Sequence, residues 1–306
     1  GSREKGTDRR MRDGIICIDK PAEHTSFDVI ARVRGILHMK KVGHAGTLDP
    51  MTTGVLPVFL GRATKACDIL PVQDKRYRAR FQLGVTTDTQ DCTGTVLERR
   101  EVRVSREELI AAIRSFEGEQ MQLPPMYSAI QVGGRRLYDI AREGGTVERT
   151  PRPVTFYSIE ILDLGEDWAE IDVHCSKGSY IRTLCHDIGE KLGCGAMLTQ
   201  LRRTMAAGFT EADCLTLEQL TALAAEGRAE EAVIPVERIF DCLPRLTLTP
   251  KLTWLFLNGA PLSLTQFTLP EGEELAVWSE AGEFLGIAAP DQVAGRLVTR
   301  KLFKLL

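Results

Sequence analysis

One carboxylate stands in a loop whose residue types suit chemistry. Residues 44–54 read His-Ala-Gly-Thr-Leu-Asp-Pro-Met-Thr-Thr-Gly. Gly46 and Gly54 bracket this loop and can adopt backbone angles that other residues avoid. Pro50 biases Asp49 toward extended geometry, so the loop would present a single carboxylate with a histidine nearby. Such a carboxylate can act as a covalent nucleophile. An Asp-Pro turn on the surface is the simpler interpretation of this fragment alone.

Three kinds of carboxylate chemistry can be compared with the surrounding residues. Aspartyl-phosphate enzymes need Mg²⁺ and further acids close by, and residues 50–54 supply no acid. Paired-carboxylate glycoside hydrolysis needs a second acid; Asp88 and Asp91 are available, but nothing in the sequence fixes their geometry. A single carboxylate can still attack a glycosidic carbon when the leaving base needs little help. A cation such as Arg182 would then keep the carboxylate ionised, and a ring such as Tyr77 would hold a base that has left its stack.

The elements that would position these two residues can be predicted from periodicity. Residues 75–84 alternate between a cationic side and an apolar side that holds Tyr77 and Phe81, which predicts a half-buried antiparallel strand. Tyr77 is then either a core ring or a ring that faces a cleft. Arg182 falls on the first turn of a helix predicted to run to about Leu192, among mostly apolar neighbours. An arginine buried there needs a carboxylate or phosphate partner, because an unpaired buried charge is costly.

The remaining pattern predicts an α+β fold with a mixed, mainly antiparallel sheet, because long strands are interrupted by helices without βαβ alternation. Ser26 is the expected N-cap of a helix that ends near Leu37. Further strands are predicted over residues 14–18, 153–164, 168–175 and 197–206. Further helices are predicted over residues 63–70, 105–116, 135–143 and 251–258, and after a capping box at 216–219. Short strands near residues 275–279, 284–288 and 296–303 predict a small β-rich domain at the C-terminal end.

Composition excludes several classes of protein and leaves a polyanion partner open. The chain has 306 residues, 43% of them hydrophobic and 26% charged, with a net charge of -3. Residues 1–82 carry 16 Lys and Arg against 9 Asp and Glu, whereas residues 211–241 carry 8 acids against 2 bases. Such segregation allows a basic binding face on a mildly acidic protein. The sequence contains no long apolar run, no P-loop and no dinucleotide-binding motif, so no membrane span or nucleotide cofactor is expected.

The eight cysteines include no C-x-x-C pair, which argues against a zinc site and against a disulfide framework. Free thiols in a reducing cytoplasm are the simplest account, and the cytoplasm is therefore the expected location. Residues 1–12 are strongly charged and are predicted to form a disordered tail.

Six blocks of the sequence resemble the TruB-type tRNA pseudouridine synthases. The catalytic block of that family is similar to His44–Pro50 together with Gly54 and Gly61-Arg-Ala-Thr-Lys65. The resemblance covers about residues 13–205, in order and at the family's spacing. The other matching blocks are Asp19-Lys20-Pro21, Lys75-Arg-Tyr77, Pro125-Met-Tyr127-Ser-Ala, Arg136-Leu-Tyr138 and Ser176-Lys-Gly-Ser-Tyr180-Ile-Arg182-Thr-Leu.

The resemblance implies isomerisation of uridine 55 in the T-loop of tRNA to pseudouridine. Asp49 would be the nucleophile, attacking either C1′ of the ribose or C6 of the uracil. Tyr77 matches the aromatic residue that packs on the target base, and Arg182 matches the arginine that pairs with the catalytic carboxylate. His44 matches a residue placed against the RNA, although without the resemblance it would be taken as a loop histidine. Tyr180 and Leu201 match positions that line the uracil pocket, and neither a cofactor nor a metal is implied.

The resemblance also implies how RNA would be held. Residues 13–243 would form the catalytic domain of the pseudouridine synthase type, with an RNA-gripping insertion at 118–150. Residues 244–306 would form a PUA-like RNA-binding domain. Further RNA contacts are expected at Lys20, Lys65, Arg135, Arg136 and Arg142, although these arginines would equally suit a solvated face.

The expected partner is the T-arm of tRNA, and the chain is expected to act as a monomer without an obligate protein partner. The alternatives are a non-catalytic chaperone that remodels the T-arm, and a synthase that depends on a guide RNA. The second is disfavoured because an insertion that grips RNA would make the chain self-sufficient.

Overall fold

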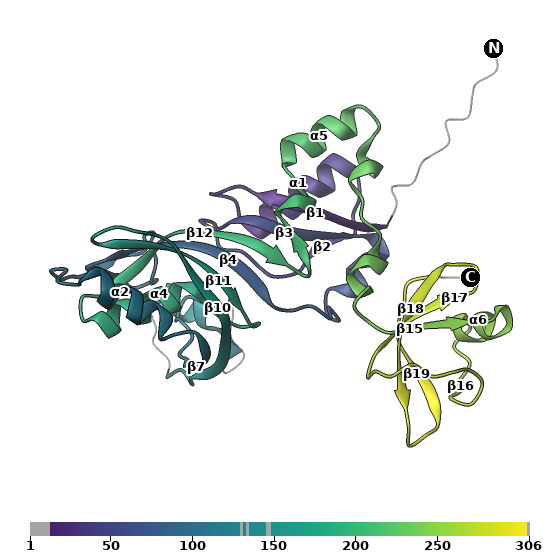
Figure 1. Ribbon diagram of the computed structural model, residues 1–306. Helices are drawn as coiled ribbons and strands as arrows, with labels where there is room; N and C mark the ends of the chain where they lie inside the picture. The colour runs from purple at the N-terminus through teal and green to yellow at the C-terminus, as the bar shows by residue number, and fades with distance from the viewer. Residues whose placement is uncertain (1–12, 129–130, 133–134, 145–147, 305–306) are drawn as a thin grey trace, which may run out of the picture.

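The computed structural model describes residues 13–128, 131–132, 135–144 and 148–304. The tail predicted over residues 1–12 lies outside this part of the chain. The described residues form two large sheets and two small hairpins, with helices packed against them (Figure 1). Within the described ranges, no helix has the length and apolar character needed to cross a membrane.

The first sheet has ten strands, in the order β14-β1-β3-β12-β4-β11-β10-β7, with β13 added to β12 and β2 added to β3. It is mixed and mainly antiparallel, as predicted: in the ladder, only β1 with β14 and β3 with β12 run parallel. Its strands are β1 (Gly14–Lys20), β2 (Val42–His44), β3 (Thr53–Leu60), β4 (Lys75–Leu83), β7 (Gly118–Gln122), β10 (Arg152–Leu164), β11 (Trp168–Cys175), β12 (Ala196–Ala206), β13 (Phe209–Thr210) and β14 (Cys214–Leu215). β5 (Val85–Thr87) and β6 (Val96–Arg99) form a separate hairpin.

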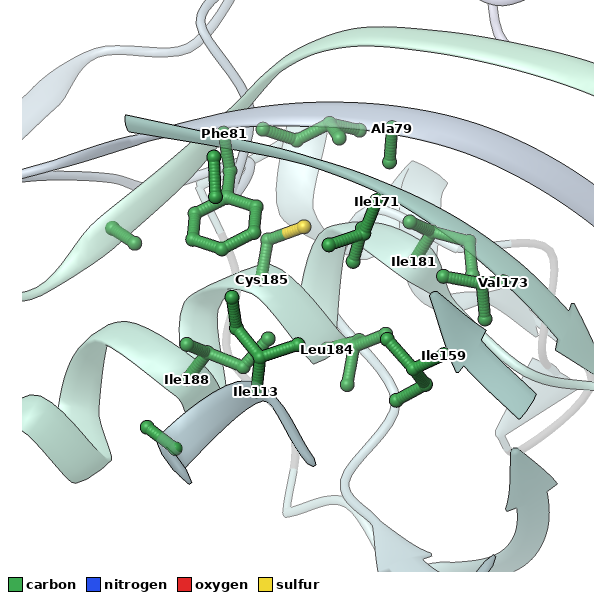
Figure 2. Packing of buried hydrophobic residues seen from close by; sticks show 14 of the residues in the cluster. Ala79, Phe81, Ile113, Ile159, Ile171, Val173, Ile181, Leu184, Cys185 and Ile188 are labelled. Carbon is green, nitrogen blue, oxygen red and sulfur yellow. The ribbon is translucent and has the colours of Figure 1, made fainter. Parts of the chain in front are cut away.

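Two pairs of helices pack on this sheet. α2 (Arg106–Arg114) and α4 (Ile181–Leu192) lie together against β4, β10 and β12, and α1 (Ser26–Leu37) lies beside α5 (Leu217–Ala225) near β1 (Figure 1). α4 ends at Leu192, as predicted, and its C-cap Gly193 has a φ of 82°, a left-handed conformation that glycine adopts readily. Figure 2 shows side chains of α4, α2 and the strands meeting in one core, among them Phe81, Ile171 and Leu184.

The prediction for the start of α1 is wrong by one residue. Thr25, not Ser26, is the N-cap: its hydroxyl accepts a hydrogen bond from the amide of Asp28 at 2.9 Å, and the Asp28 carboxylate accepts one from the amide of Thr25 at 2.8 Å. This reciprocal capping box satisfies two amides at once. Ser26 is instead buried, and its hydroxyl accepts a hydrogen bond from the amide of Leu48 at 2.9 Å.

The basic segment 135–143 is not a single helix either. Arg135 and Arg136 form β9, which pairs with β8 (Gln131–Val132), and α3 covers only Leu137–Arg142. Gly133 and Gly134, between β8 and β9, lie outside the described residues. The short helix expected over residues 63–70 is a 3₁₀ helix over Gly61–Ala66. Further 3₁₀ turns cover Glu211–Asp213, Ala229–Ala232 and Val236–Phe240.

The second sheet forms the small β-rich unit expected at the C-terminal end. Its five strands follow the order β15-β17-β18-β19-β16 and enclose an apolar core with α6. Their bounds are β15 (Arg245–Leu248), α6 (Pro250–Leu257), β16 (Leu262–Ser263), β17 (Leu275–Ser279), β18 (Phe284–Asp291) and β19 (Arg296–Leu302). Phe240 stacks on Phe284 at 5.8 Å, so aromatic side chains join this sheet to the segment before it. The boundary at residue 243 stays a prediction, as does the PUA-like character of this unit.

Candidate active site

The loop that carries Asp49 is tied down along its length. It leaves β2 at His44 and enters β3 at Thr53, through Gly46 and Gly54 at φ of 73° and 107°. Leu48 is buried and held by the hydroxyl of Ser26. The burial of Leu48 and its hydrogen bond to Ser26 therefore fix the position of the loop that carries the Asp49 carboxylate.

Backbone contacts with the end of β1 complete this support. The carbonyl of Pro50 accepts hydrogen bonds from the amide of Glu23 at 2.8 Å and from the ammonium of Lys20 at 3.2 Å. Lys20 also donates to the carbonyls of Pro21 and His24. Its side chain is 0% exposed, and burial lowers its pKa to about 8. Its ammonium faces the carbonyls that it anchors, and the contact of Lys20 with RNA stays a prediction.

Asp49 and Arg182 form the ion pair expected from the sequence. The Oδ2 of Asp49 lies 3.4 Å from the Nε of Arg182. The two partners differ in exposure: the side chain of Arg182 is 8% exposed and that of Asp49 is 47% exposed. The guanidinium also donates to two carbonyls, that of Thr89 at 3.2 Å and that of Tyr127 at 2.7 Å. Three contacts fix the guanidinium of Arg182, whereas the carboxylate of Asp49 is partly exposed and accessible to a substrate.

Tyr77 is half-buried on β4, between Val173 of β11 and Arg203 of β12. Burial raises the pKa of its hydroxyl to about 12, and the nearby charge of Arg203 opposes that rise. The phenol is therefore neutral at physiological pH. The negative charge of Asp49 also raises the pKa of this hydroxyl, so the phenol interacts electrostatically with the carboxylate.

Tyr180 and Leu201 belong to different elements near the loop: Tyr180 is the N-cap of α4, and Leu201 lies in β12. Tyr180 precedes α4, and its backbone is clamped by the buried Gln122, which accepts from the Tyr180 amide at 2.8 Å and donates to its carbonyl at 3.1 Å. Burial raises the pKa of the Tyr180 hydroxyl, and the charges of Arg182 and Asp49 both act on it. Leu201 lines a cavity of about 560 Å³ together with Pro50 and Met51. The structure thus brings both side chains to the neighbourhood of the loop.

His44 stands at the entrance of the loop, paired with Val58 of β3. Its Nδ1 is buried without a hydrogen-bond partner among the described residues. Burial lowers its pKa, and the charge of Arg203 lowers it further, so the imidazole is neutral at physiological pH. His44 also lines a cavity of about 340 Å³ that includes Lys75 and Lys177.

The remaining sequence-predicted RNA contacts lie farther from the loop along the chain. The ammonium of Lys65 donates to the carbonyl of Leu302 at 3.2 Å and so connects the Gly61–Ala66 turn to β19. Arg135, Arg136 and Arg142 are exposed, and Arg135 pairs with Glu143. Their contact with RNA stays a prediction.

Sequence reasoning missed two residues that shape the site. Gln122 clamps the backbone of Tyr180, and no local pattern distinguishes it from other polar residues in an extended segment. Arg203 is fully buried between Gly54 and Tyr77. A signal for Arg203 was present: in a strand, residues two apart share a face, and Arg203 therefore shares a face with Leu201.

No three His, Cys, Asp and Glu side chains of the described residues gather into a group that could hold a metal ion. What the site offers is one accessible carboxylate, one fixed guanidinium beside it, two neutral phenols and a neutral imidazole. This set suits nucleophilic attack on an uncharged, planar substrate group.

Comparison with known proteins gives a consistent result over nearly the whole chain. Residues 34–181 match the model of the TruB family pseudouridylate synthase N-terminal domain, and residues 182–241 match that of the tRNA pseudouridylate synthase B C-terminal domain. A protein of Stutzerimonas stutzeri (strain A1501) named tRNA pseudouridine synthase B is 43% identical over 97% of both chains. One of Dehalococcoides mccartyi (strain CBDB1) with the same name is 41% identical over 91% of this chain and 93% of its own.

A solved structure is also similar to this chain. The chain from a crystal structure of a Cbf5-Nop10-Gar1 complex is 27% identical, with a TM-score of 0.76 over 97% of this chain and 86% of that one. The similarity therefore extends over both sheets.

Proposed function

The chain belongs to the TruB family of pseudouridylate synthases, and on that premise we propose that it converts uridine 55 in the T-loop of tRNA to pseudouridine, with Asp49 as the nucleophile. The chain is an isomerase that acts on uridine in tRNA, as its relatives named tRNA pseudouridine synthase B are. The observation that carries the assignment of Asp49 is its ion pair with a buried arginine, in a loop fixed on both sides. A protein that only remodels RNA has no need of such a pair, so the chaperone alternative is not favoured.

The reaction conserves every atom of the nucleotide. Attack at C1′ forms a bond from the Asp49 carboxylate to the ribose and breaks the C1′–N1 bond, whose electron pair leaves with the uracil. The freed base turns, its C5 bonds to C1′, and the carboxylate leaves. The proton on C5 is then lost while N1 gains one. Attack at C6 instead forms the covalent bond to the base before C1′–N1 breaks; both routes need an ionised carboxylate beside the flipped nucleotide.

The surroundings of Asp49 suit a base that has left its stack. The ring of Tyr77 would pack on the uracil, and base–aromatic stacking of this kind is worth about 1–3 kcal/mol. Tyr180 and Leu201 would line the pocket. His44, neutral and half-buried, would fill the space that the extruded nucleotide leaves in the RNA. Arg182 would hold the carboxylate in the orientation for attack.

The rest of the RNA would be held by two further regions. The insertion at 118–150 presents exposed arginines on β9 and α3, which would contact phosphates. The C-terminal sheet would act as a PUA-like RNA-binding unit. Lys65 would contribute to RNA binding through its hydrogen bond to the carbonyl of Leu302, because that hydrogen bond helps to fix β19 relative to the catalytic sheet.

The chain would act alone, as a monomer, in the cytoplasm. The curated relatives are named as single proteins, whereas the similar solved chain comes from a complex with Nop10 and Gar1. All eight cysteines are free, as expected of a reducing compartment.

Mapping pseudouridine in treated RNA tests this function. A T-arm stem-loop is incubated with the purified chain, without other RNA or protein, and pseudouridine is located by carbodiimide adducts and mass spectrometry. The proposal predicts one modification at uridine 55, and none in a matched stem-loop with cytidine at that position. Modification elsewhere, or only in the presence of an added guide RNA, would contradict it.

A further inference from the structure

Arg203 occupies the centre of the first sheet although it carries a charge. It lies in β12, opposite Gly54 of β3 on one side and Tyr77 of β4 on the other. Its side chain is 0% exposed, so it is among the largest fully buried side chains of the described residues. The guanidinium cannot reach solvent or an RNA ligand from this position.

The same residue contacts both ends of the loop that carries Asp49. Its Nε donates to the carbonyl of Val55 at 2.8 Å, directly after the loop. A Cβ built on Gly46 would lie 2.8 Å from its Nη1, and one built on Gly54 would lie 2.1 Å from its carbonyl oxygen. The two glycines that bracket the loop are therefore each required by a different part of Arg203, the first by its side chain and the second by its backbone.

No ion pair with a described carboxylate compensates the charge of Arg203. The phenol of Tyr77 lies beside the guanidinium and favours its charged form, but neither terminal nitrogen makes a hydrogen bond of good geometry with a described residue. Burial lowers its pKa, and its charge in turn lowers the pKa of His44 and of Lys75. A buried cation without an anionic partner destabilises a fold, and an apolar residue of similar volume would be as stable or more stable there. Stability alone therefore does not account for an arginine at this position.

We propose that Arg203 is a positioning residue of the isomerisation: it clamps both ends of the Asp49 loop onto β12 and places a fixed positive charge beside His44 and Tyr77. It acts through these residues and does not touch the substrate. This role deepens the proposed function and rests on it.

Two substitutions and a matched control test the role. Arg203→Met removes the charge and the hydrogen bond to Val55 but keeps an unbranched side chain that can fill the space. Arg203→Lys keeps a charge without the planar guanidinium that contacts Gly46. Arg202→Met is the control: Arg202 is adjacent on the same strand, and its guanidinium pairs instead with Asp19 at 3.0 Å and Glu211 at 2.7 Å.

Four quantities are measured for each variant: Tm, the Kd for the T-arm stem-loop, the single-turnover rate and the pKa of His44 by NMR titration, assigned with His44→Gln. Arg203→Met is expected to keep its Tm and Kd and to lose about 100-fold in rate, the size of effect that a small misplacement of reacting groups produces. Its His44 pKa should rise, because the lowering charge is gone. Arg203→Lys should return this pKa toward the wild-type value and recover only part of the rate. Arg202→Met should lower Tm without changing the rate of the folded fraction or the pKa of His44.

The proposal is overturned if Arg203→Met reacts at the wild-type rate, or if its rate falls only in proportion to an unfolded fraction. An unchanged His44 pKa in Arg203→Met would overturn the electrostatic part. Failure of the proposed function looks different: the wild-type chain would then leave uridine 55 unmodified, whereas the Tm and the His44 pKa report on Arg203 whether or not the chain has activity.

Discussion

The carboxylate of Asp49 lies 3.4 Å from the Nε of Arg182, and only the arginine of this pair is buried. The asymmetry has a functional consequence. The guanidinium donates hydrogen bonds to two backbone carbonyls, and Arg182 itself lies in the first turn of α4. The guanidinium therefore stays in place when a substrate binds. Asp49 is aligned by it yet remains accessible, as a nucleophile must be.

The three contacts of Arg182 predict that lysine cannot replace it. An ammonium retains the charge but cannot contact Asp49 and the carbonyls of Thr89 and Tyr127 in the same fork-like geometry. Arg182→Lys should lower the single-turnover rate by about 100-fold or more, with a smaller effect on the Kd for the stem-loop. A wild-type rate in Arg182→Lys would show that charge alone suffices.

Tyr77 is predicted to act through its ring. Its hydroxyl has a pKa of about 12 and stays protonated over the working pH range, so no inflection from Tyr77 is expected in the pH–rate profile below about pH 10. Tyr77→Phe should keep most of the affinity and rate, whereas Tyr77→Ala should lose about 1–3 kcal/mol of stacking, seen in single-turnover titrations with stem-loop RNA. Equal losses in both variants would assign the role to the hydroxyl instead.

Gly54 is predicted to tolerate no side chain. A Cβ there would lie 2.1 Å from the carbonyl oxygen of Arg203, so Gly54→Ala must move β3 away from β12. Gly178 offers a matched control, because its φ of 77° is also left-handed but no atom outside its immediate neighbours lies within 4 Å of the built Cβ. Gly178→Ala should destabilise the fold by about 1 kcal/mol from backbone strain alone, and Gly54→Ala by much more. Urea denaturation measures both, and similar losses would contradict the steric account.

Lys20 is predicted to make stability depend on alkaline pH. Its pKa falls from 10.5 in the unfolded chain to about 8 in the folded one, so between these values the unfolded chain binds more protons. The free energy of unfolding should therefore rise as pH increases from 8 to 10.5, by up to about 3 kcal/mol from this group. Urea denaturation of the wild type and of Lys20→Met at pH 7.5, 8.5 and 9.5, which run from just below this window to about 1.5 units into it, isolates the effect. A difference between the two proteins that is constant with pH would contradict it.

Much of the fold could be predicted from local periodicity. The alternation over Lys75–Leu83 fixes β4 because its apolar face is buried, and one register slip would expose it. The helix predicted to run to about Leu192 ends at that residue. The ion pair of Asp49 with Arg182 could be predicted because both residues match family blocks and a buried arginine requires a partner.

What could not be predicted depends on contacts distant in sequence. Thr25 and Ser26 are equally suitable N-caps by residue type. The hydroxyl of Ser26 accepts a hydrogen bond from the amide of Leu48, a contact distant in sequence, and Thr25 is the N-cap. Lys20 is a lysine at the end of a strand, which is normally solvated. Its burial here includes a contact with the Pro50 carbonyl, thirty positions along the chain, which its local sequence does not reveal. The segment 135–142 divides between β9 and α3 because Arg135 and Arg136 pair with β8. The sequence of the segment has a helical pattern and gives only a weak signal for this strand pairing.

The most direct measurement is tritium release from C5-labelled uridine in a T-arm stem-loop by Asp49→Asn, which keeps the shape of the side chain and removes its charge. The account predicts that release is abolished while the stem-loop still binds with wild-type affinity, because the amide is a poor nucleophile and the surfaces that hold RNA are unchanged. Release at the wild-type rate in this variant would contradict the account.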